Sequence, residues 1–170
     1  MASPLRWTAA AALGLTLACG RGAEPAALRR AAAAGDSGFA GVQERGAAAM
    51  GVNQYTSTHV FEPLPDGGRI ELQRDVQDSG GIAQIRSHMA LIAERFKAGD
   101  FSLPGFVHAR AVPGTDVMAA KRAVIVYSVE SLPRGGAVRV RSADPEAVRA
   151  IHDFLAFQRH DHHASAHPDS

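Results

Sequence analysis

Alternation of apolar and polar residues predicts a β-hairpin in the first half of the chain. The segments 56–64 and 69–76 both favour strands, and they flank the sequence Leu-Pro-Asp-Gly-Gly. Asp66-Gly67 is a strong signal for a two-residue turn, because glycine supplies the positive φ that such turns require. After Ser79 the period changes to three and four, which predicts an amphipathic helix. Its apolar face consists of Ile82, Ile85, Met89, Ile92 and Phe96.

The second half repeats this order. Strand-like segments at 123–132 and 137–142 flank Leu-Pro-Arg-Gly-Gly, whose Arg-Gly pair marks the predicted turn. A helix follows, with Asp144 as its predicted N-cap and Pro145 in its first turn. We therefore predict an α+β domain of order ββαββα, in which two hairpins form a four-stranded, mainly antiparallel sheet with both helices on one face. The repeat is as consistent with an internal duplication as with two hairpins of similar turn.

Two-residue turns at these positions fix which side chains share a face of the sheet. The predicted cross-strand pairs are Phe61 with Leu72, Val129 with Val140, and Glu130 with Arg139. On this parity His59 and its counterpart Tyr127 point toward the helices. Between the two halves, residues 101–121 show no sustained period, and a structureless stretch of this length is often functional.

The first residues predict export. Arg6 precedes an uncharged, mostly apolar run that ends at Ala18 and Cys19, which is the layout of a secretory signal. The sequence Leu-Thr-Leu-Ala-Cys is similar to a bacterial lipoprotein box, whose cysteine becomes the lipidated N-terminus, and ordinary cleavage after Ala18 is the alternative. We predict a signal peptide at 1–19, a lipid anchor at Cys19, and a location in the cell envelope or periplasm at a membrane.

Composition divides the rest of the chain. Residues 20–49 are rich in Ala and Gly and nearly free of large apolar residues, which predicts a tether. The α+β domain is predicted at 50–163 and a polar tail at 164–170. With 18 basic and 17 acidic residues among 170, the chain lacks the charge excess of a nucleic-acid-binding protein. Cys19 is the single cysteine, so an intrachain disulfide cannot form.

Histidines are the main candidates for chemistry. Of the eight histidines, four lie in the C-terminal segment 160–167, and the others are His59, His88, His108 and His152. His88 and His152 occupy similar places beside the apolar stripes of the two predicted helices. These four imidazoles form the predicted metal site, with copper or haem as its cofactor, because neutral imidazole binds both copper and haem iron.

The predicted pocket around this site contains Tyr127, Met89, Met118 and Phe106. The two methionines add soft sulfur that suits copper. The alternative is that each histidine is a structural residue at the boundary of the core, since no pair has the close spacing of a metal motif. The chain has no nucleophile elbow, P-loop or dinucleotide-binding motif, so the sequence favours a binding protein over an enzyme.

The segments MGVNQ, TSTHVF, LPDGGRIEL, FKAGDFSLPGFVH, PGTDVM and AVRAIHDFLAFQ follow one another between residues 50 and 162. In this order they resemble a family of short exported bacterial proteins, some of which are labelled aspartate carbamoyltransferases. The family pattern has paired histidines, whereas this chain keeps His59 and His88 but has Val60 and Leu91 at the second positions. The resemblance therefore implies weaker metal binding if the family binds metal through those pairs. Three further histidines match the pattern: His108, His152 and His162.

Carbamoyltransferase activity is not expected. That reaction needs a Ser-x-Arg-Thr turn at a helix N-terminus to hold carbamoyl phosphate, and no such turn occurs in this chain. We expect instead an exported, lipid-anchored envelope protein with a small ligand-binding domain. The alternative is a module that binds another envelope protein through the exposed face or edge of its sheet and holds no metal.

Overall fold

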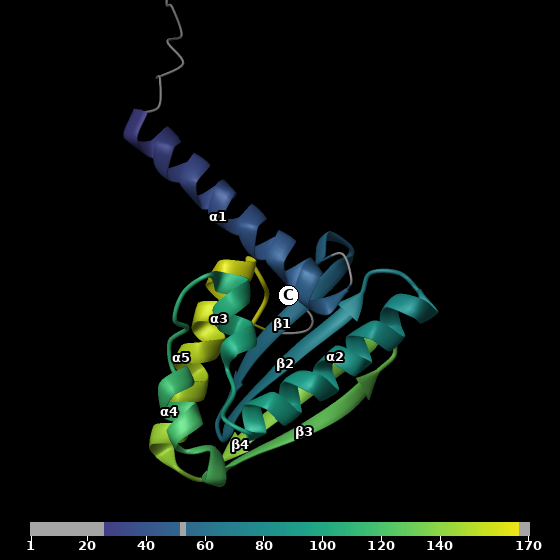
Figure 1. The fold of residues 1–170 in the computed structure, drawn as a ribbon, viewed down its shortest axis with the longest axis vertical. Helices are drawn as coiled ribbons and strands as arrows, with labels where there is room; N and C mark the ends of the chain where they lie inside the picture. Colours follow the sequence, from purple (N-terminus) through teal and green to yellow (C-terminus); the bar gives the residue numbers. More distant parts are fainter. Residues whose placement is uncertain (1–25, 52–53, 167–170) are drawn as a thin grey trace, which may run out of the picture.

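The computed structural model describes residues 26–51 and 54–166, and the predicted signal peptide and Cys19 lie outside this part of the chain. Four strands form one antiparallel sheet in the order β1-β2-β4-β3 (Figure 1). The strands are β1 (Ser57–Leu64), β2 (Gly67–Arg74), β3 (Ile125–Leu132) and β4 (Gly135–Ser142). Each hairpin is followed by a long helix, α2 (Ser79–Lys97) or α5 (Pro145–His162). The predicted α+β class and its ββαββα order are confirmed.

Each long helix packs on the hairpin of the other half. Helix α2 follows β1 and β2 in sequence but packs mainly against β3 and β4, whereas α5 follows β3 and β4 but packs mainly against β1 and β2. In the pairing of the two central strands, Ile70 lies opposite Val138, its counterpart in the repeat. An approximate two-fold axis therefore passes through this pair and exchanges the two halves of the domain.

Both turns lie one residue earlier than predicted, at Pro65-Asp66 and at Pro133-Arg134, and the pairing register is consequently shifted by two residues. The observed pairs include Phe61 with Ile70, Val129 with Val138, His59 with Leu72, and Tyr127 with Val140. Proline suits the first position of a turn because its φ is already fixed near the required value. A shift of two leaves each side chain on its predicted face, so His59 and Tyr127 still point toward the helices.

The paired glycines belong to the strands, where they allow close packing. A Cβ on Gly67 would lie 2.3 Å from the Val140 carbonyl oxygen of the neighbouring strand. A Cβ on Gly68 would lie 2.1 Å from Leu155 Cδ1 on α5. In each half the first glycine thus permits the approach of β2 and β4, and the second lies beneath the covering helix.

A matching contact ties each helix to the turn below it. Nε2 of His152 on α5 lies 2.9 Å from the Leu64 carbonyl oxygen, and Arg86 on α2 donates to the Leu132 carbonyl oxygen at 2.7 Å. Leu64 and Leu132 are equivalent in the repeat, so the structural counterpart of His152 is Arg86. The sequence spacing had matched His152 with His88, and this alignment was wrong by two residues.

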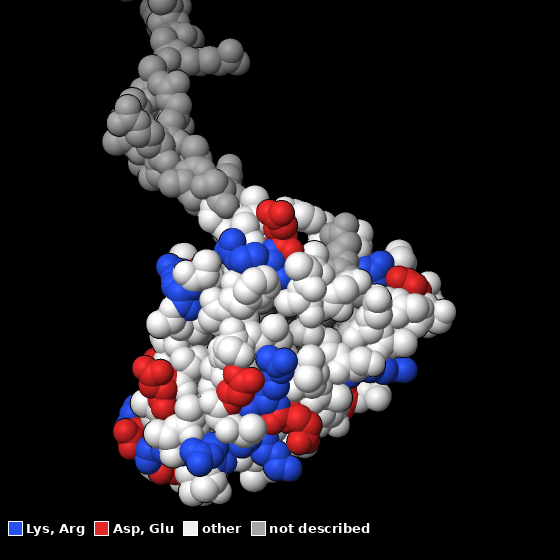
Figure 2. Space-filling model, viewed as in Figure 1, with Lys and Arg blue, Asp and Glu red and all other residues white. Residues whose placement is uncertain are grey.

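The ion pair predicted between Glu130 and Arg139 does not form, because the register shift places Glu130 opposite Ala137. Glu130 instead pairs with Arg69, whose Nη2 lies 3.2 Å from its Oε2. Arg139 forms an ion pair with Asp66 in the first turn. Side chains of both signs are interspersed on the face drawn in Figure 2, with no patch of a single sign.

The segment predicted as a tether is mostly helical. Helix α1 (Ala26–Met50) extends away from the domain at its N-terminal end, and its last turns pack against α3 (Ser102–His108) and α5 (Figure 1). Val42 is 4% exposed there, and Arg45 Nε donates to the Val107 carbonyl oxygen at 2.7 Å. The small residues that suggested a tether allow α1 to approach the domain closely.

The segment 101–121 contains two short helices, α3 and α4 (Thr115–Ala120), so it is more regular than predicted. Single 3₁₀ turns at Gln54–Thr56 and Arg122–Val124 precede β1 and β3. Within the described residues, no helix is both long enough and apolar enough to cross a membrane.

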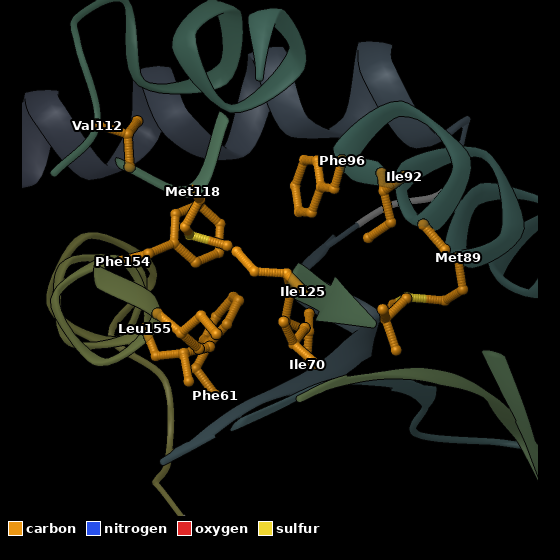
Figure 3. Close-up of a cluster of buried hydrophobic side chains, with 14 of the residues drawn as sticks. Phe61, Ile70, Met89, Ile92, Phe96, Val112, Met118, Ile125, Phe154 and Leu155 are labelled. Atoms are coloured by element: carbon orange, nitrogen blue, oxygen red, sulfur yellow. The ribbon is translucent and has the colours of Figure 1, made fainter. Parts of the chain in front are cut away.

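The core lies between the sheet and the two long helices. Its buried side chains include Phe61, Ile70, Phe96, Phe154 and Leu155 (Figure 3). Figure 3 also shows Met118 beside Phe154, whereas Met89 lies on the opposite side of the cluster beside Ile92. Both methionines are almost fully buried.

Candidate ligand-binding site

A pocket of about 80 Å³ lies at one end of the core, between β1, β2 and the helices α1, α2, α3 and α5. A water molecule needs roughly 10–15 Å³ of such space, so the pocket has room for several waters or for a small ligand. Its walls are mostly apolar. Of the described residues that line it, none is Asp, Glu, Lys or Arg.

Four histidines from four different elements line this pocket: His59 on β1, His88 on α2, His108 on α3 and His162 on α5. The rings of His59 and His162 are stacked with their centroids 5.1 Å apart. The His108 ring lies 5.1 Å from that of His162 and is perpendicular to it. Segments that are far apart in sequence thus bring imidazoles together at one place.

Three of these imidazoles are neutral at pH 7. Burial and the neighbouring His88 lower the pKa of His59 to about 4, and burial lowers the pKa of His88 to about 4. Burial lowers the pKa of His162 to about 3, with further lowering by His59 and His108. A neutral imidazole keeps a nitrogen lone pair free to accept a hydrogen bond or to bind a metal ion.

One nitrogen in this group has no partner. Nδ1 of His162 is buried and forms no hydrogen bond with any described residue. A buried polar atom without a partner costs about 1–3 kcal/mol of stability, so such atoms are rare in folded proteins and often belong to functional sites.

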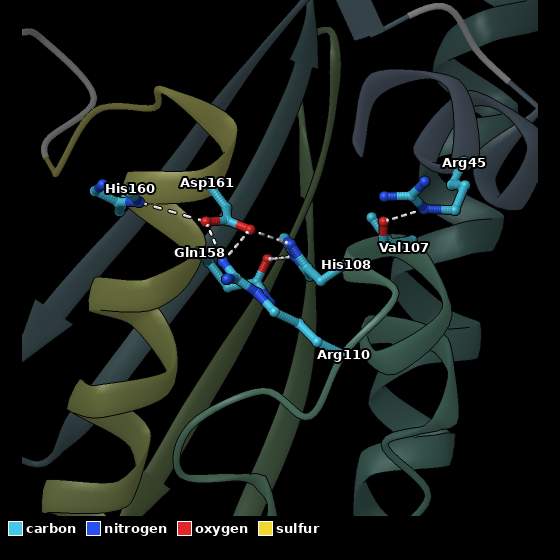
Figure 4. Close-up of polar contacts among 7 residues, drawn as sticks. All are labelled: Arg45, Val107, His108, Arg110, Gln158, His160 and Asp161. Atoms are coloured by element: carbon cyan, nitrogen blue, oxygen red, sulfur yellow. Dashed lines mark hydrogen bonds and ion pairs between the residues drawn. The ribbon is translucent and has the colours of Figure 1, made fainter. Parts of the chain in front are cut away.

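His108 is fully engaged in a network that joins α3 to α5 (Figure 4). Its Nδ1 lies 2.9 Å from Asp161 Oδ2, and its Nε2 lies 2.9 Å from Gln158 Oε1. Arg110 donates to both carboxylate oxygens of Asp161 and stacks over Phe157 at 4.6 Å. Because both of its ring nitrogens have hydrogen-bond partners, His108 has a structural role in lining the pocket.

The residues equivalent to three of these histidines in the other half form an aromatic cluster, and two of its members, Phe96 and Phe154, also line the pocket. In the two-fold relation, His59, His88 and His162 correspond to Tyr127, Phe154 and Phe96. The Phe96 ring lies 6.1 Å from Tyr127 and 5.8 Å from Phe154. Aromatic rings can therefore fill these positions in the fold without the cost of desolvating three imidazoles. The histidines exceed what packing requires, which makes their end of the core the candidate functional site.

The structure separates the residues predicted for the site into two groups. His59, His88, His108 and Met89 line the pocket, whereas His152, Met118, Tyr127 and Phe106 do not. His152 holds the first turn, Met118 is in the core, and Phe106 is 54% exposed. Tyr127 packs against Phe96, and burial raises the pKa of its hydroxyl, which has no hydrogen-bond partner among the described residues.

The pocket residues that sequence reasoning did not assign to the site include His162 and Met50. His162 was assigned to the group of histidines near the C-terminus, yet Ile151, Leu155, Gln158 and His162 continue the helical stripe at spacings of four, three and four. This spacing was a usable signal. Met50 was placed at the start of the domain, and only the packing of α1 brings it to the pocket.

The four-histidine metal site predicted from the sequence does not form. Within the described residues, no three His, Cys, Asp or Glu side chains are placed to hold a metal ion. Imidazole lone pairs lie in the ring plane, so the stacked rings of His59 and His162 do not aim them at a common point. Haem does not fit either, because about 80 Å³ is too small for a macrocycle and no lining Arg or Lys can pair with its propionates.

Comparisons with protein-family models, with curated proteins and with solved structures find no match to this chain. The case for a function therefore depends on the pocket itself.

Proposed function

We propose that this protein is an exported, lipid-anchored protein of the cell envelope whose domain binds a small ligand in the histidine-lined pocket. The observation that carries the proposal is Nδ1 of His162, which is buried on a residue that lines the pocket and has no hydrogen-bond partner among the described residues. A ligand that pairs with this nitrogen removes the cost of leaving it unsatisfied.

The charge of the lining predicts the charge of the ligand. An anion in this pocket would lose its hydration and meet no Arg or Lys among the described lining residues. Its neighbours would be neutral imidazoles and apolar side chains, since the pKa values of His59, His88 and His162 lie near 4 or below. The ligand is therefore bound through neutral donor atoms and apolar contacts, and anions are excluded.

The proposed envelope location is supported by the first residues of the sequence. The apolar run and the sequence before Cys19 are typical of an exported lipoprotein. Helix α1 begins its described course on the far side from the domain and ends at the pocket wall (Figure 1). Radiolabelled palmitate on the wild-type chain, and none on a Cys19→Ser variant, would support the anchor, whereas an unlabelled wild type would refute it.

Binding is tested with probes that share one carbon skeleton and differ in charge. Isobutanol and isobutyrate are titrated into the full chain, and the methyl signals of Met89, Ile92 and Met118 are followed by NMR. Isobutanol is expected to move the pocket signals of Met89 and Ile92 with a Kd in the millimolar range, about −4 kcal/mol. Isobutyrate should leave both signals unmoved.

Two variants control this experiment. His162→Phe copies the aromatic residue of the other half and should fill the pocket, so isobutanol no longer moves Met89. His160→Gln changes an exposed neighbour and should leave binding unchanged. Equal shifts at Met118 and Met89, or full binding by the His162→Phe variant, would contradict a pocket site.

A second candidate function is the binding of another envelope protein at the edge of β3. This edge strand has Val126 and Val129 exposed by 57% and 47%, whereas Phe61 N of the other edge strand donates to the Ser165 carbonyl oxygen. An open, apolar edge can accept a further strand. Slower amide exchange of β3 in intact envelopes than in the purified protein would support this function, and equal exchange would oppose it.

A further inference from the structure

We propose that the ligand of the pocket is a soft monovalent metal ion, Cu(I), bound by the thioethers of Met50 and Met89 together with the imidazole of His162. This inference rests on the proposed ligand-binding function and names the class of its ligand. Met50 is the last residue of α1 and Met89 lies in the middle of α2, and both line the same pocket as His162.

The donor types select the metal. Thioether sulfur is a soft ligand that favours Cu(I), and imidazole also binds copper well, whereas Mg²⁺ and Ca²⁺ need several oxygen ligands. Two methionines and four histidines line the pocket without any described carboxylate. The absence of a group of three His, Cys, Asp or Glu side chains in the described chain argues against a zinc-type site. It does not bear on a site in which methionine supplies part of the ligand set.

The charge balance of the pocket points the same way. The cost of moving an ion from water into an apolar site rises with the square of its charge, so a divalent ion pays about four times the penalty of a monovalent one. A site whose described donors are all neutral cannot offset that penalty with an opposite charge. A monovalent cation bound by polarizable sulfur therefore has the lowest desolvation penalty in this pocket.

The protonation state also suits a metal ligand. His162 Nδ1 is buried without a partner, so a lone pair or a proton there has no competing contact to lose among the described residues. Metal binding requires an imidazole nitrogen whose lone pair is not engaged elsewhere, and Nδ1 of His162 meets this requirement among the described residues.

The test uses Ag(I), which has the charge and softness of Cu(I) and does not change its oxidation state in air. Three methionines follow the predicted signal peptide, so the methyl signals of Met50, Met89 and Met118 are assigned by single Met→Leu variants. The full chain carries Cys19→Ser to remove the thiol. One equivalent of Ag(I) is expected to move the signals of Met50 and Met89 and to leave that of Met118, a core methionine outside the pocket, in place.

Matched variants then separate coordination from packing. Met→Leu exchange approximately conserves volume and removes the sulfur. Met50→Leu and Met89→Leu should each weaken Ag(I) binding about tenfold or more, the range seen when support for a bound metal is lost. Met118→Leu should leave it unchanged. An equivalent of Zn²⁺ should not displace Ag(I).

The outcomes distinguish the two proposals. If isobutanol moves the Met89 signal but Ag(I) moves neither Met50 nor Met89, Cu(I) is not the ligand and the pocket remains a binding site for another small ligand. If neither probe moves them, both proposals fail. Ag(I) binding confined to the exposed histidines near the C-terminus, with the Met50 and Met89 signals unmoved, also overturns the metal proposal.

Discussion

Acid is expected to unfold this domain through the three neutral imidazoles of the pocket. In an unfolded chain a histidine has a pKa of about 6.5, whereas the pKa values of His59, His88 and His162 in the folded domain are about 4, 4 and 3. Below pH 6.5 these histidines become protonated in the unfolded chain but stay neutral in the folded domain. The stability is therefore complete above pH 6.5 and is lost as the pH falls toward 4.

The size of the loss follows from these pKa values. At pH 5, a histidine with a folded pKa of 4 or lower lowers the free energy of unfolding by about 2 kcal/mol, and the three together lower it by about 6 kcal/mol. Domains are typically stable by only about 5–15 kcal/mol, so this change is large enough to unfold a marginal one. Near pH 5 the unfolded chain binds almost three more protons than the folded domain, so the free energy of unfolding changes by about 4 kcal/mol per pH unit.

Urea unfolding between pH 7 and pH 5 measures this slope, and two variants test its origin. His59→Tyr and His162→Phe copy the residues of the aromatic cluster in the other half, and each should remove about one proton from the slope. His160→Gln, at a side chain that is 87% exposed, should leave it unchanged. If the double variant His59→Tyr/His162→Phe loses stability in acid as steeply as the wild type, the pocket imidazoles are not the cause.

Three further predictions concern the packing around the site. Gly114→Ala should lower the free energy of unfolding in urea by about 3 kcal/mol or more, because Gly114 has φ +81° and a Cβ there would lie 2.1 Å from a carbonyl oxygen of α5. As a control, Gly38→Ala should be neutral or stabilising, because a Cβ at Gly38 meets nothing within 4 Å. His152→Ala should lower stability by about 1 kcal/mol and Arg86→Ala by more, since both tie a helix to a turn and Arg86 Nε also donates to the Gly135 carbonyl oxygen at 3.0 Å; no effect of either substitution would contradict their equivalent roles. Val42→Asp should detach the end of α1, seen as faster amide exchange in that helix and loss of isobutanol binding, and unchanged exchange would show that Val42 does not hold α1 in place.

The elements of the fold were predictable because their signals are local. The buried faces of α2 and α5 repeat every three or four residues, and the strands alternate, since each has one face against the core. The side of the sheet that carries His59 was also predicted correctly, although the register was not. A register error of an even number of residues preserves the face of every side chain.

The role of the paired glycines could not be read from the sequence. Asp66-Gly67 has the composition of a hairpin turn, and the turn nevertheless lies at Pro65-Asp66. What requires Gly67 and Gly68 is the approach of β4 and of α5, which belong to the distant second half of the chain. Conformational freedom at a turn and lack of space beneath a helix select the same residue, so composition alone does not distinguish them.

The pocket was predicted only in part for a similar reason. His59 was chosen from the parity of its strand, His88 from its place beside a helical apolar stripe, and His108 from its place in the segment 101–121. All three line the pocket. Met50 comes from a helix whose Ala and Gly residues carry no period that would predict packing. Its place at the pocket depends on how α1 packs against α3 and α5, which is a property of the folded chain.

The exchange of helices between the two halves has a consequence for what the site can be. A two-fold dimer of half-length chains would display every residue twice, so it would have either imidazoles at both ends of its core or aromatic rings at both. In the single chain, the two copies of each position are separate codons that change independently. The domain can therefore keep aromatic residues at Tyr127, Phe154 and Phe96 and place histidines at the equivalent positions, so that the packing of the aromatic rings offsets the desolvation of the histidines.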